Sequence, residues 1–298
     1  MSAPAMAEER APAMRPLDLL ALSSMVLIWA CNFIIGKLGV AQIPPILLVA
    51  LRFTLVAVLL FPFLRRPGPA LLPVAAISFV LGALHFSLMF TGLRGVDAAA
   101  AAITTQLMVP FSVLLAALFF RERTGPMQIG GIVLAFAGVY TISGDVRAGI
   151  DPLYLLMIVG AAFTFALASV QIKKLGPVNV FVLNARIALL AAPQLFLASA
   201  VLEHDHLQAL QAADWRGWGA VVFGAVFVTV AGHGLYYHLL GKYPVNKVVP
   251  PTLLVPVLAV VLAVLILDEP LTARIVVGGL LTVTGVAVVE LVPGRRKR

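Results

Sequence analysis

The stretch LMVPFSVLLAALFFRER at residues 107–123 decides the fold, because a variant of it returns at residues 253–270 as LLVPVLAVVLAVLILDEP. In both copies a Val-Pro pair is followed by an apolar run and then by a glutamate. A glycine, Gly138 or Gly285, stands 16 residues beyond that glutamate. The proline-to-glutamate spacing differs by one residue, so the copies form a weak internal duplication. Such repeats are typical of membrane proteins with pseudo-two-fold symmetry.

The composition is that of a chain embedded in a membrane. Hydrophobic residues make up 61% of its 298 residues, charged residues 11%, and the mean hydropathy is +1.05. The net charge of +8 is spread over loops and one tail, so it does not indicate a nucleic-acid partner. The single cysteine, Cys31, excludes an internal disulfide and a zinc-type ligand set.

Ten apolar stretches predict an all-α integral membrane protein with ten transmembrane helices, since about 20 residues cross the roughly 30 Å hydrocarbon layer. The predicted spans are residues 17–39, 45–64, 71–93, 98–120, 126–143, 152–173, 178–201, 215–240, 246–267 and 271–292. We divide the chain into a polar tail, two five-helix repeats and a basic tail. These parts are residues 1–16, 17–145, 150–292 and 293–298.

The basic residues predict the orientation of the chain. Ten spans place both termini on one side, where the segments carry 14 Lys and Arg residues, against 5 in the opposite loops and 2 inside spans. Because cytoplasmic loops carry the excess of basic residues, we expect both termini in the cytoplasm.

An odd number of spans in each repeat means that the second repeat enters the membrane from the opposite side. Several positions match in order between the two halves. The matches are Trp29 and Lys37 with Phe165 and Lys173, Arg52 with Arg186, and Pro110 with Pro256. Two inverted repeats favour alternating access over a static pore.

With these motifs in order, the chain resembles EamA-like members of the drug/metabolite transporter superfamily over nearly its whole length, from about Leu17 to Leu291. The motifs that carry the resemblance include Trp29 with Asn32-Phe33, Leu51-Arg52-Phe53, Arg121-Glu122-Arg123 and Leu267-Asp268-Glu269. Within the family it looks most like bacterial exporters of O-acetylserine and cysteine. The resemblance implies a ten-helix inner-membrane exporter whose central cavity is formed mainly by spans 1, 3, 4, 6, 8 and 9.

Polar residues inside the spans are the candidate binding residues, because each needs a partner or an aqueous cavity in hydrocarbon. Asn32 lies one helical turn from Trp29 in the first span, and both are candidates for the cavity. His85 is near the middle of the third span, where it is a substrate contact, a protonation site or a structural residue. Gln106 precedes Pro110 by four residues, so the proline leaves its carbonyl without the usual donor.

The eighth and sixth spans add further candidates. His233 and Tyr236 share a helix face in the eighth span, with small glycines nearby that also favour close packing. Ser169 and Gln171 in the sixth span lie two residues apart, so they cannot share a face, and the sequence does not choose between them. Substrate binding is therefore predicted for Trp29, Asn32, His85, Gln106, Ser169, His233 and Tyr236, with His85 and His233 as candidates for coupling.

Other residues are interpreted as structural. Pro110 and Pro256 predict helix kinks. Arg52 and Arg186 lie several residues inside the second and seventh spans, and we expect structural pairing of each. Glu122 and Glu269 stand at span ends, where we expect ion-pair partners rather than a role in coupling.

Together these features predict an inner-membrane exporter of small amino-acid metabolites of the cysteine and O-acetylserine class, working by alternating access with proton coupling. No nucleophile motif, phosphate loop or metal-spaced cluster predicts an enzyme, and we expect no cofactor and no metal. The expected partners are a small-molecule substrate, the lipid bilayer and protons. The alternatives are export of other amino acids or of aromatic or cationic drugs and, in another class, a scaffold or receptor that transports nothing.

Overall fold

The structure, a computed structural model, describes residues 14–121, 124–143, 145 and 150–291. Within these ranges the chain is helical and has no strand. Nine helical stretches are long and apolar enough to cross a membrane, and Pro45–Leu59 is a shorter apolar helix. These ten segments follow the ten predicted spans in order, so the prediction of an all-helical membrane protein is confirmed. The predicted tails at residues 1–16 and 293–298 lie almost wholly outside the described residues.

The first half of the chain contains ten helical elements, several of which join into one span. They are α1 (Pro16–Val40), α2 (Pro45–Leu59), α3 (Phe61–Leu64), α4 (Leu71–Ile77), the π-helix η1 (Ser78–His85), α5 (Phe86–Gly95), α6 (Ala98–Thr104), the 3-10 turn η2 (Thr105–Leu107), α7 (Met108–Phe120) and α8 (Pro126–Ser143).

The second half contains ten more. They are α9 (Pro152–Leu175), α10 (Val180–Leu202), α11 (His206–Ala212), α12 (Trp215–Val222), the π-helix η3 (Phe223–Gly232), α13 (His233–Lys242), α14 (Val245–Val248), the 3-10 turn η4 (Pro250–Leu253), α15 (Leu254–Leu267) and α16 (Ala273–Leu291).

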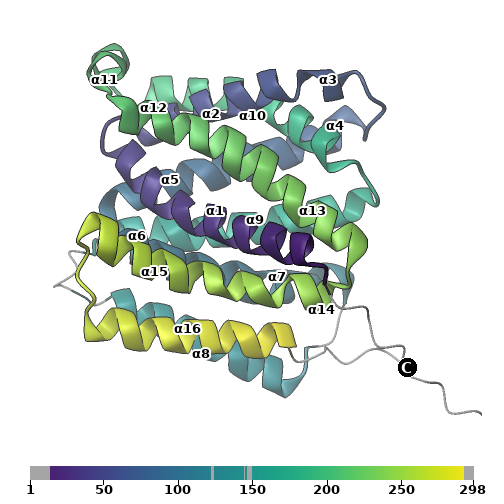
Figure 1. Cartoon of the computed structure of the whole chain (residues 1–298), viewed down its shortest axis with the longest axis vertical. Coiled ribbons are helices and arrows are strands. Elements are labelled where there is room, and N and C mark those ends of the chain that lie inside the picture. Colours follow the sequence, from purple (N-terminus) through teal and green to yellow (C-terminus); the bar gives the residue numbers. More distant parts are fainter. Residues whose placement is uncertain (1–13, 122–123, 144, 146–149, 292–298) are drawn as a thin grey trace, which may run out of the picture.

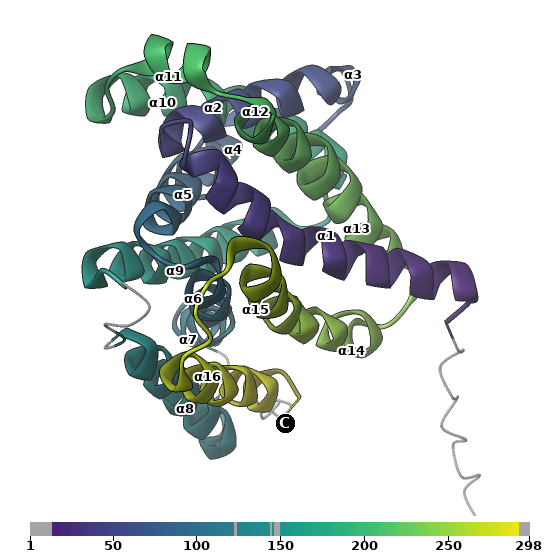
Figure 2. The ribbon, with the colours of Figure 1, turned by 60° about the vertical axis from the view of Figure 1, so that its left-hand side comes forward.

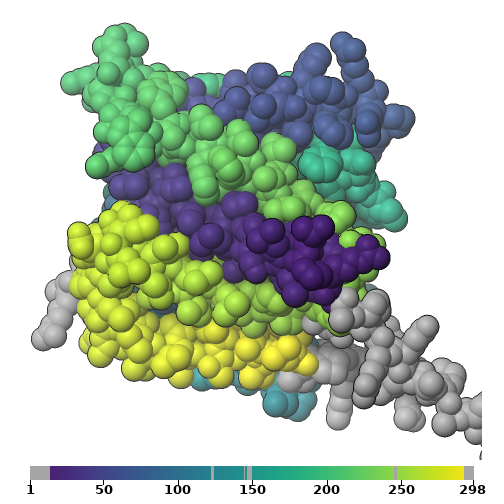
Figure 3. All heavy atoms as spheres, in the orientation of Figure 1, coloured from purple at the N-terminus to yellow at the C-terminus, as the bar shows by residue number. Residues whose placement is uncertain are grey.

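The start of α1 and the end of α16 lie on the same side of the bundle, at the right in Figure 1. We call this the terminal side and the other, where α11 lies, the opposite side. Figure 2 shows α1 crossing the bundle between α13 and α15, with the pair α8 and α16 at the bottom. In the space-filling view of Figure 3, α1 is likewise flanked by segments from the last third of the chain.

Proline explains a local feature that the two halves share. Pro110 in α7 and Pro256 in α15 each follow a 3-10 turn, η2 or η4. A proline cannot donate a hydrogen bond to the carbonyl four residues earlier, so the regular α-helical pattern is interrupted just before it. Each of these spans also ends in the left-handed conformation, with φ of 54° at both Arg121 and Asp268.

Glycines explain the close packing of α8 against α16. A Cβ atom on Gly138 would collide with the Gly278 carbonyl, and one on Gly285 would lie 2.5 Å from the Gly131 carbonyl. The contacts are reciprocal: Gly138 of α8 faces Gly278 of α16, and Gly131 of α8 faces Gly285 of α16. Small residues of this kind let helix backbones approach closely within a membrane.

The glycine contact yields a stability prediction. We expect Gly138→Ala to lower the free energy of unfolding by about 1–3 kcal/mol, because the added methyl group overpacks the α8–α16 contact. The measurement is thermal unfolding of the detergent-purified protein. Gly130→Ala is the matched control in the same helix, since a Cβ atom there meets nothing within 4 Å. An equal loss of stability in both variants would contradict the packing role.

Candidate functional site

A cavity of about 1030 Å³ lies inside the bundle and is the candidate site. Six of the seven predicted binding residues line it: Trp29, Asn32, His85, Gln106, His233 and Tyr236. The seventh, Ser169, is not among its lining residues, and its hydroxyl donates to the carbonyl of Phe165 in its own helix. The cavity wall in α9 is formed by Phe165 itself.

Two aromatic–histidine pairs line the cavity. The Trp29 ring on α1 meets His233 on α13 at 5.9 Å between centroids, and the Phe165 ring on α9 meets His85 at 5.4 Å. Trp29 and Phe165 are matched positions of the two repeats, and His85 is the last residue of the π-helix η1, while His233 directly follows the π-helix η3. π-helical turns are rare and frequently occur at functional sites.

The polar atoms of these two pairs differ in their hydrogen bonds. His85 Nδ1 lies 2.8 Å from the carbonyl oxygen of Ala161, so this nitrogen carries a proton and donates it. In contrast, Trp29 Nε1 and His233 Nδ1 are buried and have no hydrogen-bond partner among the described residues. Buried polar atoms are normally paired, so these two are available to a molecule that occupies the cavity.

Charged residues line the cavity nearer the terminal side. Glu290 in the last turn of α16 is one, and its Oε2 atom is buried without a hydrogen-bond partner in the described part of the chain. Arg121, which follows α7, is another. The sequence reasoning missed Glu290, although it is the one acid within the predicted span 271–292. The sequence pattern does not single out Glu290, because it stands close to the basic tail and because the matching position in the first half, Ser143, is not an acid.

Arg52 and Arg186 make no ion pair among the described residues, so the expectation of ion pairs is replaced by other contacts. Arg52 is 1% exposed, donates from Nη2 to the Thr229 hydroxyl at 3.0 Å, and lies over the Phe86 ring at 5.0 Å. Arg186 donates to the backbone carbonyls of Pro69 and Arg66. A guanidinium has five donors, so hydroxyl and carbonyl oxygens can take the place of an acid.

The predicted ion-pair partner of Glu269 is replaced by a helix N-terminus. The Glu269 carboxylate accepts hydrogen bonds from the backbone N–H groups of Ala98 and Ala99, at 2.7 and 3.0 Å, where α6 begins. Its matched residue, Glu122, lies outside the described residues. A carboxylate at this place satisfies free N–H groups and complements the helix dipole.

Lys37 helps to close the cavity on the opposite side of the bundle. Its Nζ atom donates to the carbonyl oxygens of Leu93 at 3.0 Å and of Val96 at 2.7 Å, which ties α1 to the end of α5. Neither Lys37 nor Glu269 lines the cavity, whereas Arg121 and Glu290 of the terminal side do. The cavity therefore extends toward the terminal side and is closed on the opposite side.

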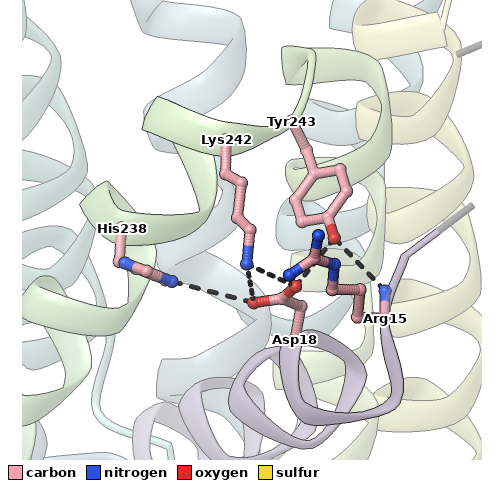
Figure 4. A network of polar contacts seen from close by, with 5 residues as sticks. All are labelled: Arg15, Asp18, His238, Lys242 and Tyr243. Carbon is pink, nitrogen blue, oxygen red and sulfur yellow. Dashed lines mark hydrogen bonds and ion pairs between the residues drawn. The ribbon is translucent and has the colours of Figure 1, made fainter. Parts of the chain in front are cut away.

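A polar network joins α1 to α13 at the terminal side (Figure 4). Asp18 is buried and accepts hydrogen bonds from Lys242 Nζ at 2.8 Å and from the Tyr243 hydroxyl at 2.7 Å. The same hydroxyl accepts a hydrogen bond from the backbone N–H of Arg15, and His238 Nε2 lies 3.7 Å from the Asp18 carboxylate. This network fixes one edge of the cavity mouth, because α1 and α13 both contribute to the wall.

Comparison with known proteins gives the family of this fold and cavity. The sequence pattern of the EamA-like transporter family matches residues 16–144 and, a second time, residues 152–291. A "Probable amino-acid metabolite efflux pump" of Escherichia coli (strain K12) is 31% identical, over 88% of this chain and 90% of that protein. A protein of the same description from Salmonella typhimurium (strain LT2) is 30% identical, over 88% and 90% of the two chains.

A solved crystal structure shares the fold. The TM-score is 0.63 at 22% sequence identity, and the match covers 93% of this chain and 98% of the other.

The Glu269 contact yields a first prediction for this region. We expect Glu269→Gln to lower the free energy of unfolding by about 1–3 kcal/mol, because a neutral amide is a weaker acceptor for the two N–H groups of α6. Thermal unfolding in detergent measures the change. Asp268→Asn is the matched control, since the Asp268 side chain is exposed and Asn tolerates its left-handed backbone. Equal melting temperatures for Glu269→Gln and the wild type would rule out this stabilising role.

Asp97, between α5 and α6, yields a prediction about pH. Burial, followed by the negative charge of Glu269, raises the pKa of Asp97 from 3.8 to about 6. The folded state therefore holds this proton to a higher pH than the unfolded chain, and stability falls as the pH rises from about 4 to about 6. We expect Asp97→Asn to remove this fall and to stabilise the protein at pH 7 by about 1 kcal/mol, a figure reduced for partial exposure. Melting curves at several pH values test this, and identical profiles for variant and wild type would refute it.

Proposed function

This chain belongs to the EamA-like transporter family, and we propose that it exports small amino-acid metabolites of the cysteine and O-acetylserine class across the bacterial inner membrane. The family is one of transporters and not of enzymes. Two relatives at about 30% identity carry the description of a probable amino-acid metabolite efflux pump, and the shared length covers most of each chain. A further relative is described as an inner membrane transporter.

The observation that carries the proposal is a large cavity whose wall mixes aromatic rings with a few polar groups. A small zwitterion needs a few directed hydrogen bonds and a shaped apolar surface, as in other small-molecule sites. The hydrogen-bonding groups are those of Asn32, Gln106 and the two histidines, and the shaped surface is that of Trp29 and Tyr236. A volume of about 1030 Å³ accommodates such a molecule together with water.

The orientation follows from the basic residues. If the 14 Lys and Arg residues of the terminal side are cytoplasmic, the cavity faces the cytoplasm and the closure by Lys37 and Glu269 faces the outside. This is the arrangement in which an exporter takes up its cargo.

Alternating access between two inverted five-helix repeats is the proposed mechanism. The double match of the family pattern supports it, as do the reciprocal glycine contacts of α8 and α16. The matched 3-10 turns, π-helices and left-handed helix ends support it further. Two halves with the same local features can exchange conformations, which would open the opposite side and close the terminal side.

Proton antiport is the proposed coupling. His85 and His233 are paired with aromatic rings of opposite repeats, so a change in the charge of either would alter the contact between the halves. The aromatic lining also favours a second candidate function, the export of aromatic or cationic compounds, because rings bind such groups well.

Transport into inside-out vesicles tests the proposed function. We expect radiolabelled L-cysteine or O-acetyl-L-serine to accumulate when the chain is present and the vesicle interior is acidic. We expect Asn32→Ala and Gln106→Ala to lower the initial rate at least about tenfold, since each removes a hydrogen-bonding group from the cavity.

Ser169→Ala is the control, because this hydroxyl bonds within its own helix and lies off the cavity wall. Transport that does not respond to the pH gradient would overturn the coupling, and absence of transport of either compound would overturn the cargo class. Competition by aromatic amino acids or by cationic drugs would favour the second candidate function, the export of aromatic or cationic compounds.

A further inference from the structure

Glu290 is an acid within a membrane-spanning helix that the transport mechanism described so far does not use. It lies one residue before the end of α16, lines the cavity, and has a buried Oε2 atom with no hydrogen-bond partner among the described residues. An acid placed in a membrane span is energetically expensive, and such residues are usually functional.

The charges of the cavity wall are few. Among the described lining residues, Glu290 is the one acid and Arg121 the one residue with a permanent positive charge. The two come from different spans, α16 and the end of α7. A wall with one group of each sign suits a molecule that itself carries one charge of each sign.

Aromatic rings share the cavity wall with Glu290. Tyr236 is one of them, and its ring meets that of Trp29 at 5.4 Å between centroids. The Tyr237 ring is 5.4 Å from that of Tyr236 and also lines the cavity. A carboxylate that shares a cavity wall with tyrosine and tryptophan rings can bind an ammonium group, by charge pairing and by cation–π attraction.

We propose that Glu290 binds the ammonium group of the exported metabolite, with Tyr236 and Trp29 as the aromatic walls of that subsite. The inference rests on the proposed function, because it takes the cargo to be an amino-acid metabolite. The ammonium group of the cargo then lies in the terminal-side part of the cavity, and its carboxylate binds Arg121.

Three related compounds test this inference. L-cysteine carries both charged groups, 3-mercaptopropanoate lacks the ammonium, and cysteamine lacks the carboxylate. The experiment measures equilibrium binding of radiolabelled L-cysteine to the detergent-purified protein under reducing conditions, with the other two as competitors. For the wild type we expect cysteamine to compete and 3-mercaptopropanoate to be at least about tenfold weaker than unlabelled L-cysteine.

For Glu290→Gln we expect the affinity for L-cysteine to fall at least about tenfold, while the affinity for 3-mercaptopropanoate stays the same. Glu290→Asp should keep the preference for compounds with an ammonium group, because it retains the charge. Asp268→Asn, which neutralises an exposed acid, should bind as the wild type does. Size-exclusion profiles confirm that each variant is folded.

Unchanged L-cysteine affinity in Glu290→Gln would overturn the inference and leave the proposed function standing. The inference would also be overturned, with the proposed function still standing, if Glu290→Gln lost only the dependence of transport on the pH gradient. Glu290 would then be a proton carrier. A wild-type protein that binds none of the three compounds would overturn the proposed cargo class and this inference together.

Discussion

Inside a lipid bilayer no water is available to satisfy polar groups, and every other feature of this structure depends on that constraint. Many polar groups within the spans pair with another part of the chain or line the internal cavity. The Lys37 ammonium is satisfied by backbone carbonyls, and the Glu269 carboxylate by the N-terminus of α6. Trp29, His233 and Glu290 each have a buried polar atom without a hydrogen-bond partner among the described residues, and all three line the cavity. These three atoms are therefore placed to bind a cargo molecule.

The same constraint explains how the two halves are held together. Apolar surfaces gain little from contact with each other in lipid, so close backbone packing must supply the attraction between helices. The glycines of α8 and α16 provide that packing reciprocally, each half contributing the same pair of positions. The cavity shows the same relation, since Trp29 meets His233 and the matched Phe165 meets His85. Glu290 departs from the symmetry, because the matching position holds Ser143.

Most of the fold could be predicted from the sequence, because spans in hydrocarbon are long, apolar and bounded by charge. The site could be predicted in part. Six polar or aromatic residues in the spans do line the cavity, since a polar group in lipid has few alternatives. Ser169 is different, because a serine hydroxyl can bond to a carbonyl of its own helix. Arg52 and Arg186 were expected to have structural partners, and among the described residues these partners are hydroxyl, carbonyl and aromatic groups and not acids.

The sequence by itself determined the membrane fold, the order of the spans and the internal duplication, because hydropathy and repeated motifs are local properties of the chain. Only the tertiary structure decided which side of the cavity is closed and which residues from distant spans share its wall. Glu290 and Tyr236 are 54 positions apart in the sequence, and only helix packing brings them to one cavity. The physical reason is that a helix face is exposed to lipid, packed or facing a cavity according to its neighbours, and those neighbours come from both halves of the chain.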